Sequence, residues 1–185
     1  MSLVDLIAQA DERGLAASGL ACLDRCLPLL GGDDELLRPL WARLADGSDW
    51  AGELTGARAA LGPAEPSDEA ARLALRMLRS APAERTADAV RPWADACSVA
   101  SLRIHRLLDP ATPATDDGDA GRAGDTADLP PLVAAELRRQ AAVLELLAGH
   151  GAQGLRRALE VSVEGRRVLR AVVSRRARSA AEPGV

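Results

Sequence analysis

Aromatic side chains are almost missing from this sequence. It contains no Phe and no Tyr, and its only aromatic residues are Trp41, Trp50 and Trp93. The aromatic residues that favour strands are therefore scarce, whereas Ala, Leu, Arg and Glu, which favour helices, are abundant. We expect an all-α protein with an aliphatic core.

Glycine and proline divide the chain into segments whose apolar residues recur at helical spacing. We expect a bundle of about seven or eight helices, with an α-solenoid of helical hairpins as the second possible architecture. Asp33, Ser48 or Asp49, Ser67 and Pro82 mark the expected helix starts between residues 31 and 108. The expected helical segments are 2–30 (one helix or two), 34–46, 50–61, one that follows Ser67 and includes residues 73–78, 82–108, 130–149 and 154–180.

The length of 185 residues suits one domain that buries its own core. After residue 108 the composition changes to a stretch rich in Asp, Gly, Pro and Thr, without apolar periodicity. We expect residues 1–108 to form the N-terminal part of a bundle and residues 109–129 to form a long, flexible acidic loop. Residues 130–185 are expected to supply two C-terminal helices that pack on the same bundle.

Two of the expected helices carry distinctive apolar surfaces. In the terminal helix the apolar residues cover roughly 200° of the circumference, which is more than a surface helix needs. We expect this helix to be central in the bundle or covered by a second subunit. In the segment 82–108, Pro92 predicts a kink or a fresh helix start. The same segment has a heptad-like seam, suited to packing along another helix: Val90, Trp93, Cys97, Ala100, Ile104 and Leu107.

Charge is distributed unevenly along the chain, although the formal net charge is only −4. Residues 1–128 carry 22 acidic side chains and 13 arginines, a net charge of −9, whereas residues 129–185 carry 5 and 10, a net charge of +5. The arginines of the terminal helix could contact phosphates, but no aromatic residue is interleaved with them for base stacking. The alternative is a solvated face that pairs with the acidic part of the same molecule.

The sequence also bears on where the protein works. Its first residues lack the basic region of a secretory signal, and no apolar run approaches the roughly 20 residues of a membrane span. Three cysteines without an export signal indicate reduced thiols. We therefore expect a cytoplasmic protein without a membrane partner. The missing residue types, including Lys and Asn, are those with AT-rich codons, which suggests a GC-rich bacterial genome.

Candidate metal and catalytic residues are few. Cys22 and Cys26 would share a helix face, with Cys97 or His105 as remote partners, but zinc sites usually combine local pairs of ligands. His105 and His150 stand in no known nucleophile motif. We therefore expect packing roles for these residues, and no metal or cofactor.

The acidic loop offers several oxygen donors for calcium. They are Asp116, Asp117, Asp119, Asp125 and Asp128. Their spacing does not provide the ligand positions of an EF-hand loop. Phosphate-binding, dinucleotide-binding and zinc-protease motifs are likewise missing from the sequence.

The leading functional hypothesis is a non-catalytic interaction protein that self-associates through the terminal helix and the seam of the segment 82–108. A nucleic-acid-associated regulator that uses the arginine-rich helix is the alternative, and a small-molecule-binding or enzymatic bundle is the second alternative. The residues expected at the interaction surface are Arg156, Arg157, Arg167, Arg178, Leu155, Leu159, Val168 and Val172.

Overall fold

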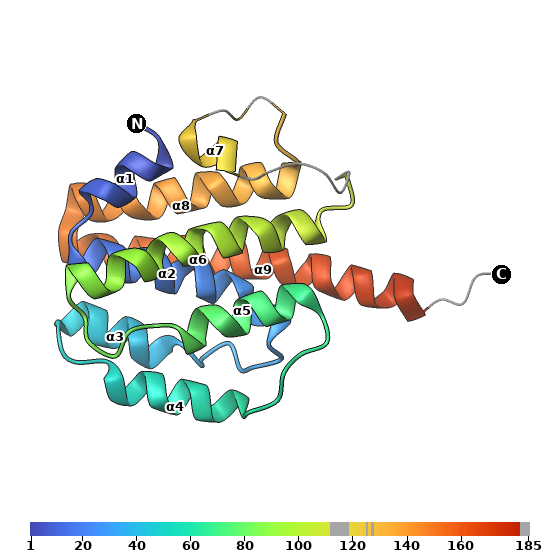
Figure 1. The fold of residues 1–185 in the computed structure, drawn as a ribbon, viewed down its shortest axis with the longest axis horizontal. Coiled ribbons are helices and arrows are strands. Elements are labelled where there is room, and N and C mark those ends of the chain that lie inside the picture. The colour runs from blue at the N-terminus through green and yellow to red at the C-terminus, as the bar shows by residue number, and fades with distance from the viewer. Residues whose placement is uncertain (112–118, 125, 127, 182–185) are drawn as a thin grey trace.

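The computed structural model describes residues 1–111, 119–124, 126 and 128–181, and every regular element within them is a helix (Figure 1). The prediction of an all-α bundle of seven or eight helices is confirmed, because this part of the chain has eight helices of seven residues or more and one of five. The α-helices are α1 (Leu3–Gln9), α2 (Glu12–Cys26), α3 (Arg38–Asp46), α4 (Ala51–Leu61), α5 (Glu69–Arg79), α6 (Ala87–Leu108), α7 (Asp119–Ala123), α8 (Pro131–His150) and α9 (Gly154–Ala181), and two short 3₁₀ turns are η1 (Leu27–Leu29) and η2 (Gly151–Gln153).

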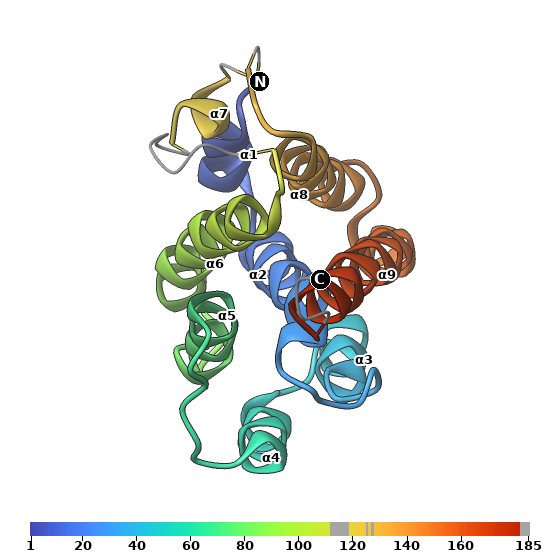
Figure 2. The same ribbon diagram turned by 90° about the vertical axis from the view of Figure 1, so that its right-hand side faces the viewer.

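Helix α2 lies at the centre of the bundle. The helices α6, α8 and α9 pack around it, as the view along the bundle shows (Figure 2). Every residue from Gly14 to Leu27 is buried. At Gly19 an added Cβ would lie 2.5 Å from Cζ3 of Trp93 on α6, so the two helices approach where only glycine fits.

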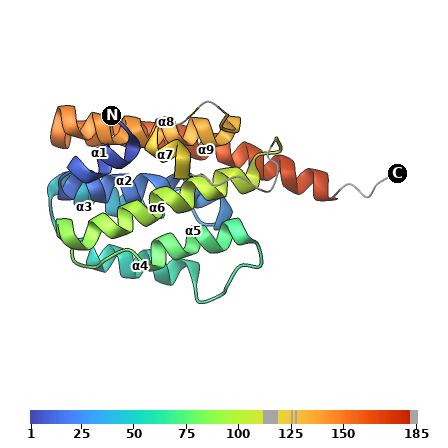
Figure 3. The same ribbon diagram turned by 45° about the horizontal axis from the view of Figure 1, so that its top comes forward.

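The shorter helices cover two opposite sides of this arrangement (Figure 2). Helix α1 packs beside α8, with α7 next to it (Figure 3). Helices α3, α4 and α5 cover the opposite side of the bundle (Figure 2). There the Trp50 and Trp93 rings meet edge to face, with centroids 5.8 Å apart. The three-helix side is therefore joined to α6 by an aromatic contact.

Several predicted helix starts are wrong by a few residues, because local caps compete with tertiary contacts. The helix expected to open at Pro82 begins at Ala87, where the hydroxyl of Thr86 accepts a hydrogen bond from the Ala89 amide. The Pro82 carbonyl instead accepts a hydrogen bond from Nε1 of Trp50. Helix α6 then continues through Pro92, so the alternative of a fresh start at that residue is also wrong.

Three further starts differ in the same way. Helix α3 begins at Arg38 and not after Asp33, whose carboxylate caps a local turn by accepting from the Glu35 amide. Helix α4 follows Trp50 and not Ser48 or Asp49. Helix α5 is capped by Asp68, one residue beyond the expected Ser67.

Part of the expected acidic loop lies within the described residues. It includes α7, from which Arg122 inserts at 6% exposure and donates a hydrogen bond from Nε to the Ser98 hydroxyl on α6. Asp109 caps α8 by accepting from the Leu132 amide. Three of the aspartates whose spacing does not fit a calcium loop, Asp116, Asp117 and Asp125, lie outside the described residues. Within the described residues, no helix combines the length and apolar character needed to cross a membrane.

Candidate interaction surface

Helix α9 packs against α2, α8 and η1 through a side made of small residues. Ala158, Ser162 and Gly165 are buried there, and the Ser162 hydroxyl is satisfied within the helix by the Ala158 carbonyl. A Cβ added at Gly165 would lie 2.4 Å from Cδ of Arg25 on α2. The small side chains therefore let α9 sit directly on the central helix.

The eight residues expected at the surface do not share one environment. Leu155 is packed into the core at 5% exposure, so it has little area to offer a partner. Leu159 and Val172 are half-buried, and Val168 is 37% exposed. The four arginines are exposed: Arg156, Arg157, Arg167 and Arg178. The wide apolar arc thus has a buried middle and flanks that remain at the surface.

One flank of α9 forms a shallow hollow of about 550 Å³ on the outer side of the helix. Its floor consists of Leu159 and Val163, both half-buried. Its rim carries both charges, with Arg156 and Arg167 at the two ends and Glu160 and Glu164 between them. Arg156 and Glu160 approach only to 3.5 Å and are well exposed, so this pair contributes little to stability.

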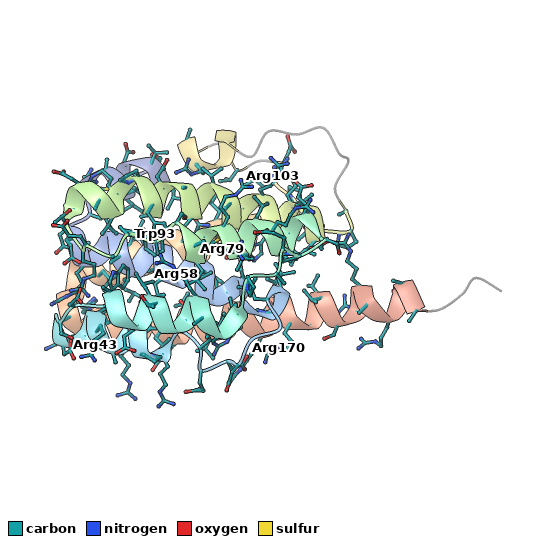
Figure 4. All side chains as sticks on the ribbon, turned by 60° about the horizontal axis from the view of Figure 1, so that its bottom comes forward. Arg43, Arg58, Arg79, Trp93, Arg103 and Arg170 are labelled. Carbon is teal, nitrogen blue, oxygen red and sulfur yellow. The ribbon has the colours of Figure 1, made fainter. Side chains whose placement is uncertain are left out.

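The middle of α9 pairs with the acidic N-terminal part of the chain. Arg166 forms an ion pair of 3.0 Å with Asp24 and donates a hydrogen bond to the Asp34 carbonyl. Burial raises the pKa of Asp24, although Arg166 and the indole N–H of Trp41 favour its charged form. Arg170 bonds the Asp34 carboxylate, and it lies at the base of the stretch of α9 that leaves the bundle (Figure 4).

The last part of α9 differs from its middle. It extends past the ends of the neighbouring helices (Figure 1), and residues 174–181 are all exposed. Arg175, Arg176 and Arg178 have no acidic partner among the residues that the structure describes. Arg176 donates a long hydrogen bond of 3.4 Å to the Leu107 carbonyl at the end of α6.

Most residues of the predicted seam on α6 are buried within the bundle. Val90, Trp93, Cys97 and Ile104 are buried, because α6 packs against α2, α5 and α8. Leu107 is 39% exposed at the C-terminal end of the helix. Little of the seam is left for a second subunit.

A groove of about 340 Å³ lies between α5 and α6. Its lining is mostly apolar, including Met77, Val99 and Cys97, and its polar side chains are Arg76, Ser80 and Arg103. His105 is not part of it. Burial raises the pKa of the Cys97 thiol well above its usual range, so this sulfur is a poor nucleophile. The groove therefore lacks an acid–base pair for catalysis.

A buried ion pair in the core was not anticipated from the sequence. Arg25 on α2 and Glu136 on α8 are both fully buried, and two parallel hydrogen bonds of 2.7 Å join the guanidinium to the carboxylate. Nη1 of Arg25 has no hydrogen-bond partner within the described chain, so Glu136 is its main compensation. A local signal existed, because Arg25 and its neighbour Asp24 follow a run from Gly14 to Leu23 that contains no charged residue.

Several protein donors surround the carboxylate of Glu136. Oε1 also accepts hydrogen bonds from the Ser101 hydroxyl at 2.7 Å and from Nε2 of Gln140 at 2.9 Å. Nε2 of His105 lies 3.6 Å from Oε2. Arg25 holds the pKa of Glu136 at about 2 despite its burial. Three of the four accepted hydrogen bonds reach Oε1 and one reaches Oε2, so this fully buried carboxylate is engaged by groups of α2, α6 and α8 and holds these helices together.

The remaining candidate residues also have packing environments. Burial lowers the pKa of His105, and its Nδ1 lies 2.7 Å from the Ser101 carbonyl. Burial raises the pKa of the Cys22 thiol to about 12. His150 is exposed at the end of α8. No group of three potential ligands suited to a metal ion occurs within the part of the chain that is described.

Comparison with protein-family models, curated proteins and solved structures gives no match for this chain.

Proposed function

We propose that this chain is a non-catalytic interaction protein that forms a homodimer through the outer face of α9. The observation that carries the proposal is the hollow over Leu159 and Val163 with its charged rim. Two aliphatic side chains remain partly exposed there, and the charges beside them sum to zero. A neutral, mixed-charge rim around an apolar floor suits another protein surface.

The rim is self-complementary, which favours a second copy of the chain as the partner. Glu160 and Arg167 stand about equally far from Val163 along the helix axis. A two-fold axis beside Val163 places Glu160 of each copy opposite Arg167 of the other, with the two α9 helices antiparallel. This contact is closed and uses the same patch twice, as homodimers do.

The charge pair provides the test. Each of the single variants E160R and R167E would place like charges across the two-fold axis, so each should be monomeric. The double variant E160R/R167E, and an equimolar mixture of the two single variants, should dimerise again because opposite charges then face each other. All these side chains are exposed, so the bundle should fold normally.

Sedimentation equilibrium is the measurement, at protein concentrations up to about 100 µM because a small interface gives a weak dimer. The matched control is E84R/E145R, which changes two exposed glutamates outside the hollow and should leave dimerisation unchanged. A monomeric wild-type protein at the highest concentration would refute the proposal, as would single variants that dimerise like the wild type.

A further inference from the structure

The distal end of α9 is a cationic segment whose arginines have no acidic partner among the residues that the structure describes. From Gly165 to Ala181 the helix contains six arginines and no acidic residue. Arg166 forms an ion pair with Asp24, and Arg170 forms one with Asp34. The three arginines beyond them, Arg175, Arg176 and Arg178, have no acidic partner in the described chain.

The shape of this segment suits a groove. Residues 174–181 continue the helix beyond Val173, which still packs on the core, and this gives about 12 Å of free helix at 1.5 Å per residue. The side chains between the arginines are small, namely Ser174, Ala177, Ser179 and Ala180. At 100° per residue the three arginines point in different directions around the helix axis.

These features favour duplex DNA over other polyanions. An α-helix has about the width of the major groove of B-DNA, and arginines directed to different sides can reach the phosphates on both groove walls. A membrane-surface helix would need large apolar side chains on one face, and residues 174–181 have none. We infer that the distal end of α9 is an arm that binds the phosphate backbone of duplex DNA without sequence specificity.

The acidic body explains why binding would be confined to the arm. Residues 1–128 carry a net charge of −9 and repel a polyanion. Since the arm projects away from the bundle (Figure 1), it brings positive charge to the DNA while the acidic surface stays at a distance. Low salt is needed to observe the interaction, because three phosphate contacts give weak binding.

The test is the fluorescence anisotropy of a labelled duplex of about 20 base pairs, titrated with the full chain between about 20 and 150 mM salt. The wild-type affinity should fall with salt, with a logarithmic slope of about −3 for three neutralised phosphates. The variant R175Q/R176Q/R178Q should bind at least about tenfold more weakly at low salt and should lose most of the slope.

The matched control is R76Q/R138Q/R157Q, which removes the same charge from three exposed positions outside the arm. It should change the affinity no more than about twofold, since these side chains lie away from the groove. Equal losses of DNA affinity in the two triple variants would overturn the inference, because binding would then depend only on the net charge of the protein. It would also be overturned by an absence of binding at low salt, or by tighter binding to anionic vesicles or an acidic peptide.

The arm and the dimer contact use different residues, so the two proposals fail separately. A wild-type monomer that binds DNA through the arm would leave this inference standing. A dimer without DNA binding would leave only self-association.

Discussion

At the scale of residues, the pair formed by Arg25 and Glu136 dominates the electrostatics of the core. Both side chains are fully buried, so each charge has lost its hydration. Their close hydrogen-bonded contact offsets this desolvation cost only while both residues are present. The pair therefore contributes more to choosing one packing arrangement than to net stability, because it joins α2 to α8 in a single register.

Removing one partner of this pair should be far worse than removing both. We expect R25M and E136Q each to lower the free energy of unfolding by about 3–5 kcal/mol, since each leaves an uncompensated buried charge. The double variant R25M/E136Q should lose much less than the sum of the two, because glutamine can still bond Ser101 and Gln140. Urea denaturation of the four proteins measures the coupling, and strictly additive losses would contradict it.

His105 should make the stability depend on pH in the range just below neutrality. Its pKa is lowered from 6.5 in the folded protein by burial, which outweighs the nearby Glu136 charge, while Arg25 and Arg139 also disfavour its protonation. Below pH 6.5 the unfolded chain takes up a proton that the folded chain does not, so the free energy of unfolding falls as the pH falls.

The expected loss is at most about 1.4 kcal/mol per pH unit below pH 6.5. Urea denaturation at pH 7.5 and 5.5 should show a smaller pH dependence in H105Q than in the wild type. The variant H150Q, at the exposed histidine, should retain the wild-type dependence. An unchanged dependence in H105Q would show that other groups control this range.

At the scale of elements, glycine has opposite roles in α2 and α4. Gly19 faces the Trp93 ring, which is fixed by a hydrogen bond from its Nε1 to the Met77 carbonyl and by its contact with Trp50. We expect G19A to lower the free energy of unfolding by about 1–3 kcal/mol through overpacking. In α4 an added Cβ at Gly56 meets no atom within 4 Å.

The variant G56A is therefore the matched control, and it should raise the free energy of unfolding by about 0.5–1 kcal/mol through helix propensity. Thermal unfolding followed by circular dichroism compares the two substitutions in one background. A G19A protein as stable as the wild type would mean that α2 and α6 can separate without cost.

The sequence allowed the helices to be predicted where breaking residues and apolar spacing agree. The terminal helix was expected over 154–180 and spans Gly154–Ala181, since glycines mark its start and its periodicity is strong. The start of α6 was missed because the Pro82 carbonyl is held by Trp50, 32 residues away. Local patterns carry no information about such contacts.

The same limit applies to the candidate sites. The exposed arginines of α9 follow from helical geometry alone, but which of them pair with the acidic part of the chain does not. Arg166 forms an ion pair with Asp24, and Arg170 forms one with Asp34, both far away in sequence. Arg175 and Arg178 form no ion pair with a carboxylate in the described chain. The separation of internal from available charge is thus a property of the tertiary structure.

At the scale of the whole molecule, the basic C-terminal part closes over the acidic N-terminal part. The ion pairs of α9 and α8 with α2 and the following loop connect segments more than a hundred residues apart. Some of the net charge of each part is therefore neutralised by ion pairs within the molecule. Two features of α9 remain at the surface, namely the neutral hollow and the cationic end beyond it.

The central position of α2 also determines when the protein can fold during its synthesis. Helix α2 is synthesised before the helices α8 and α9 that cover it, with α3 to α7 made in between. A nascent chain must therefore hold an apolar helix and the unpaired Arg25 in a partly open state until the C-terminal helices are made. Folding is completed late, and the unfinished chain is the form most exposed to aggregation and to chaperones.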